Sequence, residues 1–175
     1  MKKYTQKEFD NFEIDKYGYK ICPSGDYSLI SNFGEQCSFG ECCSFDEECS
    51  FGVECSFGER CSFGGGCSFG GWCSFSKQCS FDGWCSFGEH CRFGERCVCE
   101  FGEFKKMSTI GGFGSESRTT YFFKLTNGEI GVRCGCFAGN LNEFREKVKE
   151  THGESKMAKE YLMAADLMEY HFREE

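Results

Sequence analysis

Apolar residues recur with a period of six between Ile21 and Val98. Phenylalanine occupies every sixth position from Phe33 to Phe93, and cysteine occupies every sixth position from Cys37 to Cys97. One residue, almost always serine, separates each cysteine from the next phenylalanine. On an extended backbone Cys and Phe then point to one side and Ser to the other. The pattern therefore predicts a three-residue strand in each hexad, with Cys and Phe in the interior.

The rest of each Phe-Gly-x-x-Cys-Ser unit is typical of a turn. Glycine follows the phenylalanine throughout the run from Phe33 to Phe93 except at Asp46, Ser76 and Asp82, and two mostly polar residues come next. We expect glycine here because it adopts positive φ freely, and Asp tolerates positive φ better than most residues. A strand and a turn every six residues form one side of a solenoid, and three sides form a coil. The same frame extends back through Tyr27 and Ile21, which gives roughly thirteen hexads.

The unit Phe57-Gly58-Glu59-Arg60-Cys61-Ser62 resembles the repeat of the hexapeptide-repeat family of left-handed parallel β-helices. That repeat has an aliphatic residue, then Gly, Ala, Glu or Asp, two free positions, a small residue and one more free position; here Phe replaces the usual Ile, Leu or Val. The resemblance implies eighteen-residue coils that stack at ~4.8 Å. A twelve-residue coil, as in the disulfide-rung solenoids of some insect antifreeze proteins, is the alternative. A phenylalanine in every hexad argues against it, because such coils have almost no interior.

The sixteen cysteines would ordinarily indicate a secreted disulfide scaffold. The first ten residues, however, lack the apolar core of a signal peptide, and no apolar run is long enough to span a membrane. We therefore expect an intracellular protein, in the cytoplasm of a bacterial host cell, whose thiols are reduced. Its repeat cysteines are then small buried hydrophobic residues. A metal-cluster protein and disulfide rungs are the alternatives.

The sequence divides into four segments. Residues 1–20 are expected to cap the first coil, with a short helix from Gln6 to Phe12 that has Thr5 as its N-cap. The solenoid occupies residues 21–104. Residues 105–118 are rich in Gly, Ser and Thr and are predicted to be a linker. Residues 119–175 are predicted to form a small α+β domain of ββαα order. The predicted fold is thus mainly β, a parallel β-helix with three strands per coil followed by this domain.

Turn and cap signals define the C-terminal domain. Asn127-Gly128 predicts a hairpin whose strands, from Tyr121 to Leu125 and from Ile130 to Cys136, share one apolar face. Asn140 is the expected N-cap of a first helix, and a second is expected from Ser155 to Phe172. The segment from Gly135 to Leu162, with its Gly-Cys-Phe and Val-Lys-Glu-Thr-His-Gly runs, resembles a C-terminal module of uncharacterised phage and prophage proteins. The resemblance implies a mobile-element origin and no known chemistry.

Few residues point to catalysis or metal binding. Enzymes with the hexapeptide fold depend on solenoid histidines, and this solenoid has only His90, at a variable corner position. We therefore expect no enzymatic activity and no cofactor. A four-thiolate zinc site is a lesser alternative to packing for Cys97, Cys99, Cys134 and Cys136. Cys42 lies at a corner and is expected to be the most reactive thiol. His152 is expected at a helix end, where the helix dipole favours a cation.

The solenoid corners are the remaining candidate site. Residues 21–98 carry eleven Asp or Glu against four Lys or Arg, which disfavours binding to naked nucleic acid. With a period of eighteen, the corner acids and two tryptophans fall on three edges. The candidate protein-binding residues are Glu35, Glu54, Glu89 and Trp72 on the first, Glu41, Glu59 and Glu95 on the second, and Glu47, Glu48 and Trp84 on the third. The second edge also carries Arg60, Lys77 and Arg96.

These edges predict a non-enzymatic binding protein. An acidic rod can block the basic groove of a host nucleic-acid-binding or defence enzyme, as DNA-mimicking pentapeptide-repeat proteins do. A solvated charged surface without a partner is the simpler interpretation of the same charges. A thiol-based metal or redox store, and a structural homo-oligomer built on flat solenoid faces, are the alternative functions.

Overall fold

The computed structural model describes residues 1–173, apart from the side chain of Glu116. The chain forms two compact units, residues 1–100 and residues 101–175. The last two residues of the predicted C-terminal domain, 174 and 175, lie outside the described part of the chain.

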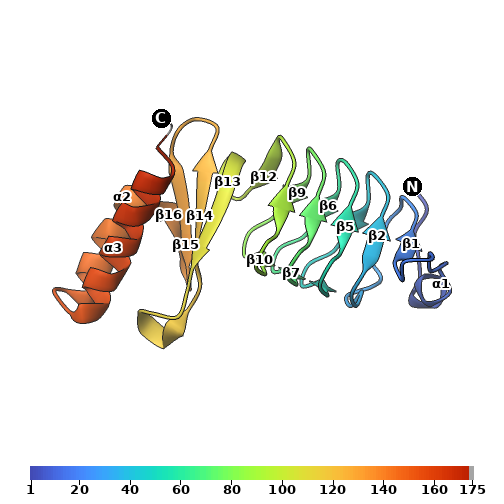
Figure 1. Cartoon of the computed structure of the whole chain (residues 1–175), viewed down its shortest axis with the longest axis horizontal. Helices are drawn as coiled ribbons and strands as arrows, with labels where there is room; N and C mark the ends of the chain where they lie inside the picture. The colour runs from blue at the N-terminus through green and yellow to red at the C-terminus, as the bar shows by residue number, and fades with distance from the viewer. Residues whose placement is uncertain (174–175) are drawn as a thin grey trace. The chain divides into compact units, whose positions relative to one another are not determined.

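The first unit is a parallel β-solenoid with three sheets, which confirms the predicted fold class (Figure 1). One sheet contains β1 (Lys20–Cys22), β2 (Cys37–Phe39), β5 (Ser56–Phe57), β8 (Ser74–Phe75) and β11 (Arg92–Phe93). The second contains β4 (Ser50–Phe51), β7 (Ser68–Phe69) and β10 (Ser86–Phe87). The third runs through β3 (Ser44–Phe45), β6 (Ser62–Phe63), β9 (Ser80–Phe81) and β12 (Cys97–Cys99).

The strand register confirms the eighteen-residue coil. Ser38 pairs with Ser56, and Ser56 pairs in turn with Ser74. Each strand therefore lies beside the strand one whole coil later, and serine hydroxyls form ladders on the outer face of each sheet. This pairing excludes the twelve-residue alternative for the described solenoid.

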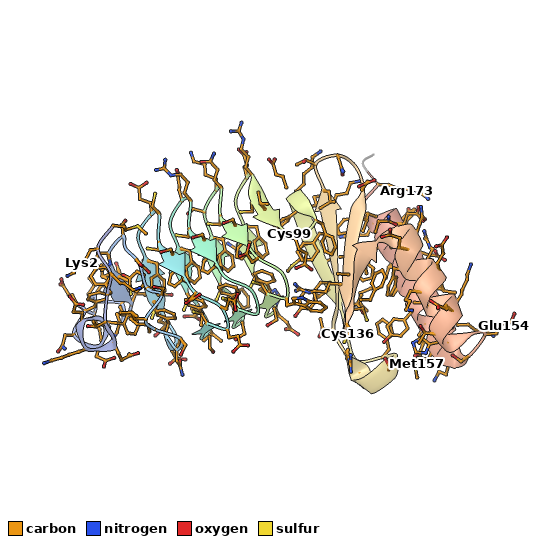
Figure 2. All side chains as sticks on the ribbon, turned by 180° about the vertical axis from the view of Figure 1, so that it is seen from behind. Lys2, Cys99, Cys136, Glu154, Met157 and Arg173 are labelled. Carbon is orange, nitrogen blue, oxygen red and sulfur yellow. The ribbon has the colours of Figure 1, made fainter. Side chains whose placement is uncertain are left out.

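The phenylalanines fill the solenoid interior in three ladders (Figure 2). Rings one coil apart are stacked; Phe39 and Phe57, for example, have centroids 5.1 Å apart and an interplanar angle of 1°. Rings of successive hexads meet edge to face, as do Phe57 and Phe63 at 4.9 Å and 90°. Offset stacks and edge-to-face pairs are the arrangements that aromatic quadrupoles favour, at ~0.5–1.5 kcal/mol beyond burial. The interior is thus an ordered aromatic lattice in which each ring contacts both other ladders.

Residues 1–20 contact the first coil. The predicted N-terminal helix is α1 (Gln6–Asp10), and the Thr5 hydroxyl accepts a hydrogen bond from the Glu8 backbone N–H, so the predicted N-cap is confirmed. The Tyr4 ring stacks on Tyr27 at 5.0 Å and continues one aromatic ladder. The sequence frame was wrong at Ile21, which is 43% exposed. Strand β1 pairs with β2 at an offset of seventeen residues, so Cys22, not Ile21, points inward.

The second unit contains a four-stranded antiparallel sheet with the order β13-β14-β15-β16. Its strands are β13 (Gly102–Ile110), β14 (Thr120–Leu125), β15 (Ile130–Cys134) and β16 (Phe137–Asn140). Strand β13 occupies half of the predicted linker; it was missed because its alternation is interrupted by Lys105 and Lys106. A 3₁₀ turn, η1 (Ser115–Ser117), lies in the rest of the linker, and the Ser115 N–H donates to the Tyr161 hydroxyl at 3.0 Å.

Two helices, α2 (Leu141–His152) and α3 (Lys156–His171), pack on this sheet. The Asn140 Oδ1 accepts hydrogen bonds from the N–H groups of Asn142 and Glu143, so the predicted cap of α2 is confirmed. The apolar stripe of α3 is core: Tyr161, Ala164 and Met168 are buried against the sheet. No helix within residues 1–173 is long and apolar enough to cross a membrane.

The hairpin β14–β15 has both faces covered. Phe122 pairs with Val132, so these two side chains share the face that packs on the helices. Phe123 lies on the opposite face, and its ring meets that of Phe104 at 5.4 Å. The predicted single apolar face, which combined Phe123 with Val132, is therefore wrong. The residues between the two strands, 126–129, set a pairing that differs by one residue from the one in which Phe123 and Val132 share a face.

Candidate functional site

The solenoid corners take their shape from the residue that precedes each cysteine. This residue has positive φ at ten non-glycine positions, from 53° at Gln36 to 69° at Trp84. The left-handed conformation turns these side chains outward, and it costs non-glycine residues about 1–2 kcal/mol. The chain therefore accepts conformational strain at the positions where it displays Glu54, Trp72, Trp84 and His90.

The glycine after each phenylalanine has a different role from the predicted one. Gly52, Gly70 and Gly88 do not have positive φ. A Cβ atom added at Gly70 would lie 2.6 Å from the carbonyl carbon of Gly52 and 2.7 Å from the nitrogen of Val53. In this column, which contains only glycine, the backbones of successive coils approach too closely for a side chain. The prediction that this residue supplies the positive φ of the turn holds at Gly34, whose φ is 68°, and is wrong for the later glycines at this position of the repeat.

The first edge, which we call edge one, carries Glu35, Glu54, Trp72 and Glu89, as predicted from the spacing; all four are exposed. Trp72 is 56% exposed, and its ring contacts that of His90, one coil later, at a centroid distance of 4.2 Å and an angle of 31°. Beside this column lies a groove of about 470 Å³, which we call the edge-one groove. It is lined by Tyr19, Glu54, Ser56, Trp72, Ser74, His90 and Arg92.

Neutral donors hold the Glu54 carboxylate in the edge-one groove. Gln36 Nε2 donates to Glu54 Oε2 at 3.0 Å, and the Tyr19 hydroxyl donates to the same oxygen at 3.4 Å. Burial and the Glu54 carboxylate raise the pKa of Tyr19 above its usual value, so the phenol keeps its proton as a donor. Within residues 1–173 no Lys or Arg forms an ion pair with Glu54. The carboxylate is thus positioned while its charge remains available.

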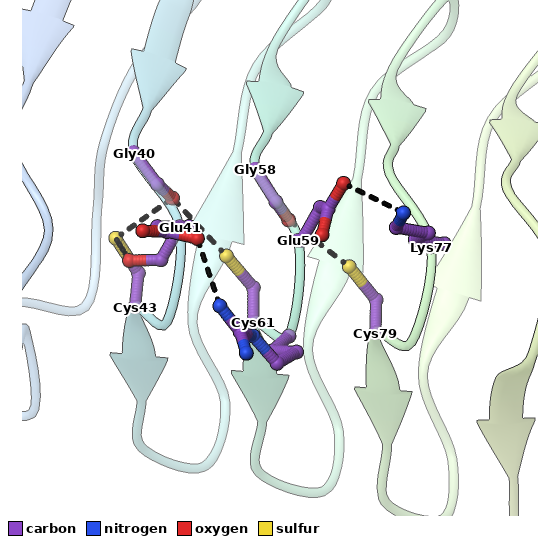
Figure 3. Close-up of polar contacts among 9 residues, drawn as sticks. Gly40, Glu41, Cys43, Gly58, Glu59, Cys61, Lys77 and Cys79 are labelled. Carbon is purple, nitrogen blue, oxygen red and sulfur yellow. Dashed lines mark hydrogen bonds and ion pairs between the residues drawn. The ribbon is translucent and has the colours of Figure 1, made fainter.

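The second edge, edge two, is close to neutral. Arg60 Nη2 lies 2.9 Å from Glu41 Oε2, and Lys77 Nζ lies 3.2 Å from Glu59 Oε1 (Figure 3). Each cation sits one coil beyond the carboxylate that it neutralises. Glu95 and Arg96 complete this edge. These surface ion pairs contribute little stability, but they remove most of the negative potential that was predicted for edge two.

The third edge, edge three, carries Glu47, Glu48 and Trp84, which are all exposed. Trp84 is 53% exposed, and its backbone N–H donates to Glu100 Oε2 at 3.0 Å. The residue one coil before Trp84 at the same corner is Gly66. That position therefore has no side chain that could hold a ligand against the indole. Edge one sets its tryptophan in a lined groove with a side chain from each neighbouring coil, whereas the coil before Trp84 contributes only Gly66 to its column.

The repeat cysteines have a packing role. The repeat cysteines are buried except for Cys91, which is half-buried. Cys61 and Cys79 donate to the carbonyl oxygens of Gly40 and Gly58, both at 3.4 Å (Figure 3). The same bond, twenty-one residues back, recurs from Cys55 to Cys97. The Cys55 thiol and burial raise the pKa of Cys73 to about 11. A thiol that is buried and protonated, as Cys73 is, is a poor nucleophile and a poor metal ligand.

The other thiol candidates differ in their surroundings within each unit. Cys97 and Cys99 are buried in the solenoid, whereas Cys134 accepts a hydrogen bond from the Thr120 hydroxyl at 3.2 Å. Cys136 is exposed and does not continue the apolar face of the hairpin. Among the described residues, no group of three or more His, Cys, Asp or Glu side chains is placed to hold a metal ion. Cys42, expected to be exposed, is half-buried, so Cys136 is the most accessible thiol.

Sequence reasoning missed part of the edge-one groove. His90 and Gln36 share the eighteen-residue column of Trp72, so that spacing could have identified them. Arg92 replaces serine at the end of a serine ladder, which is also visible as a break in the repeat. Tyr19 lies outside the repeat frame, and no spacing rule places it beside Glu54. In the second unit, His152 ends α2 as predicted, and its ring stacks on Tyr161 at 5.7 Å.

Comparison with protein-family models, with curated proteins and with solved structures found no match. The β-solenoid of eighteen-residue coils therefore stands on the strand register and the ring stacking of this chain.

Proposed function

We propose that this chain is a non-enzymatic protein-binding module that contacts its partner through edge one. The observation that carries the proposal is Trp72, which is 56% exposed inside a groove whose carboxylate, Glu54, forms no ion pair within residues 1–173. Tryptophan is enriched among the residues that dominate binding energies, and such residues lie in pockets rather than on flat surfaces. If this corner were only a solvated surface, neither the exposed indole nor the left-handed backbone of Trp72 would be expected.

The charge of edge one indicates a basic partner surface. Glu35, Glu54 and Glu89 have no Lys or Arg partner among residues 1–173, in contrast to Glu41 and Glu59 of edge two. Successive coils repeat every ~4.8 Å, so edge one offers closely spaced negative charge along a rigid line. A protein with a basic groove, such as a host nucleic-acid-binding or defence enzyme, is complementary to it. On this proposal the chain, of phage or prophage type with left-handed coils, inhibits that enzyme in the bacterial cytoplasm.

Affinity capture from a bacterial lysate with matched variants tests this proposal. The bait is the whole tagged chain, compared with the triple variant Glu35→Gln, Glu54→Gln, Glu89→Gln and with the edge-two control Glu41→Gln, Glu59→Gln. We expect a stoichiometric basic protein that high salt releases, because exposed charges are screened by salt. It should bind the control and be lost from the triple variant, and the purified partner should bind directly.

Two results contradict the proposal. A partner that binds the triple variant as well as the parent chain places the interface elsewhere. Recovery of the chain alone, with a multiple of its mass in solution, favours the homo-oligomeric scaffold.

A further inference from the structure

The edge-one groove has opposite charges at its two ends and the indole ring of Trp72 between them. Glu54 lies at one end and Arg92, two coils later, at the other. Trp72 lies between them, one coil after Glu54, whereas His90 is in the same coil as Arg92. The hydroxyl groups of Ser56 and Ser74 line the same groove. The distance along the solenoid from Glu54 to Arg92 is roughly 10 Å, two coil spacings. A ligand in this groove has to be extended, polar and oppositely charged at its two ends.

The surroundings of Trp72 define where a cation binds. In its column the coil before Trp72 carries Glu54 and the coil after it carries His90. The His90 ring already contacts one side of the indole, at a centroid distance of 4.2 Å. The side of the indole toward Glu54 is therefore the one that a ligand can cover. A cation there meets an aromatic face and a carboxylate at once, and both attract it.

We propose that the edge-one groove binds an arginine side chain of an extended peptide segment, with the guanidinium stacked on Trp72 and ion-paired to Glu54. This inference rests on the proposed function and specifies the partner. Arginine fits better than lysine, because a planar guanidinium stacks on an aromatic ring and still donates in its plane to a carboxylate. Gln36 and Tyr19 hold Glu54 Oε2, which reduces the entropy lost when the ion pair forms.

Arg92 sets the direction of the bound segment. An extended peptide advances about 3.3 Å per residue, so a span of roughly 10 Å corresponds to three residues. A carboxylate three residues from the arginine then reaches Arg92, which forms no ion pair within residues 1–173. The recognised pattern is thus an arginine and an acidic residue at positions i and i+3 of an extended segment.

Peptide titration of the full-length, ¹⁵N-labelled protein tests this proposal. The probe is an acetylated and amidated Arg-Gly-Gly-Glu peptide, and the matched control carries citrulline, which has the shape of arginine without its charge. The readout is the indole N–H signal of Trp72, with Trp84, the other tryptophan of the chain, as an internal reference. We expect a saturable shift at Trp72 only, and at least tenfold weaker binding of the citrulline peptide. Glu54→Gln should cause the same loss, and Glu41→Gln should cause none.

Equal binding of the citrulline peptide, no shift at Trp72, or equal shifts at both tryptophans would overturn the inference. These outcomes differ from failure of the proposed function. If lysate capture still depends on edge one, the binding module stands and the guanidinium assignment is wrong. If capture is independent of edge one, the binding module itself is wrong.

Discussion

Substitution of one glycine tests whether close coil stacking explains the repeat. Gly34, Gly52, Gly70 and Gly88 form a ladder made only of glycine, and it lies next to edge one. The Cβ atom of Gly70→Ala would meet three backbone atoms of the preceding coil within 2.8 Å: the carbonyl carbon and oxygen of Gly52 and the nitrogen of Val53. Backbone cannot rotate away as a side chain can. Forcing extra atoms into a packed region costs ~1–3 kcal/mol, so we expect a loss of about 2 kcal/mol in the free energy of unfolding.

Two variants at the left-handed position separate stacking from backbone conformation. Gly66 has a φ of 72°, and a Cβ atom there would meet Glu48 only at ordinary van der Waals distances of 3.5 Å or more, so Gly66→Ala should lose only about 1 kcal/mol, from left-handed strain. Gln78 is exposed with a φ of 62°, and Gln78→Gly should raise stability by about 0.5–1 kcal/mol, since relief of strain outweighs the greater entropy of unfolded glycine.

Guanidinium-induced unfolding followed by circular dichroism measures all three variants. The midpoint should fall most for Gly70→Ala, fall less for Gly66→Ala and rise for Gln78→Gly. Equal losses at Gly70 and Gly66 would refute the stacking argument. A loss at Gln78 would refute the assignment of strain to the corner position.

Three further predictions concern the thiols and the second unit. A thiol reagent should label Cys136 rapidly in the folded protein and reach the buried repeat thiols only on unfolding; fast labelling of Cys61 would contradict the packing role. The free energy of unfolding should fall as pH rises from about 9 to 11, because unfolded thiols ionise near their usual 9.0 while Cys73 keeps its proton to about 11. Unfolding curves at several pH values measure this dependence. A higher free energy of unfolding at pH 10 than at pH 8 would contradict the prediction. Asn140→Ala should lower the free energy of unfolding by ~1 kcal/mol, because it removes the N-cap of α2, and thermal unfolding measures the loss. The control Asn142→Ala, two residues later in the first turn of α2, should lower it less.

The repeat frame made most of the solenoid predictable. A strict period of six fixes which side chains share a face, and Phe at each unit requires an interior large enough for three rings per coil. The conformational role of glycine was assigned wrongly, because a hexad pattern shows that a turn exists but not which residue takes positive φ. The distance between the coils at Gly52 and Gly70 is a property of the stacked backbone, which no single hexad contains.

The candidate site was predictable only as a set of columns. The spacing placed Glu54 and Trp72 on one edge and Trp84 on another, and the structure agrees with that grouping. It could not show which carboxylates are neutralised, since the contact of Arg60 with Glu41 depends on side-chain reach between coils. In the second unit the hairpin register depended on the conformation of the loop at Asn127, which set the faces of the strands.

The most direct test of the account compares the two exposed tryptophans. With the purified partner from lysate capture, we would measure the affinities of Trp72→Ala and Trp84→Ala by calorimetry against the parent chain. Both residues are similarly exposed, and both occupy left-handed corner positions, so only their surroundings differ. The account predicts a loss of at least about 2 kcal/mol for Trp72→Ala and less than about 0.5 kcal/mol for Trp84→Ala. Equal losses, or a larger loss at Trp84, would contradict the assignment of binding to edge one.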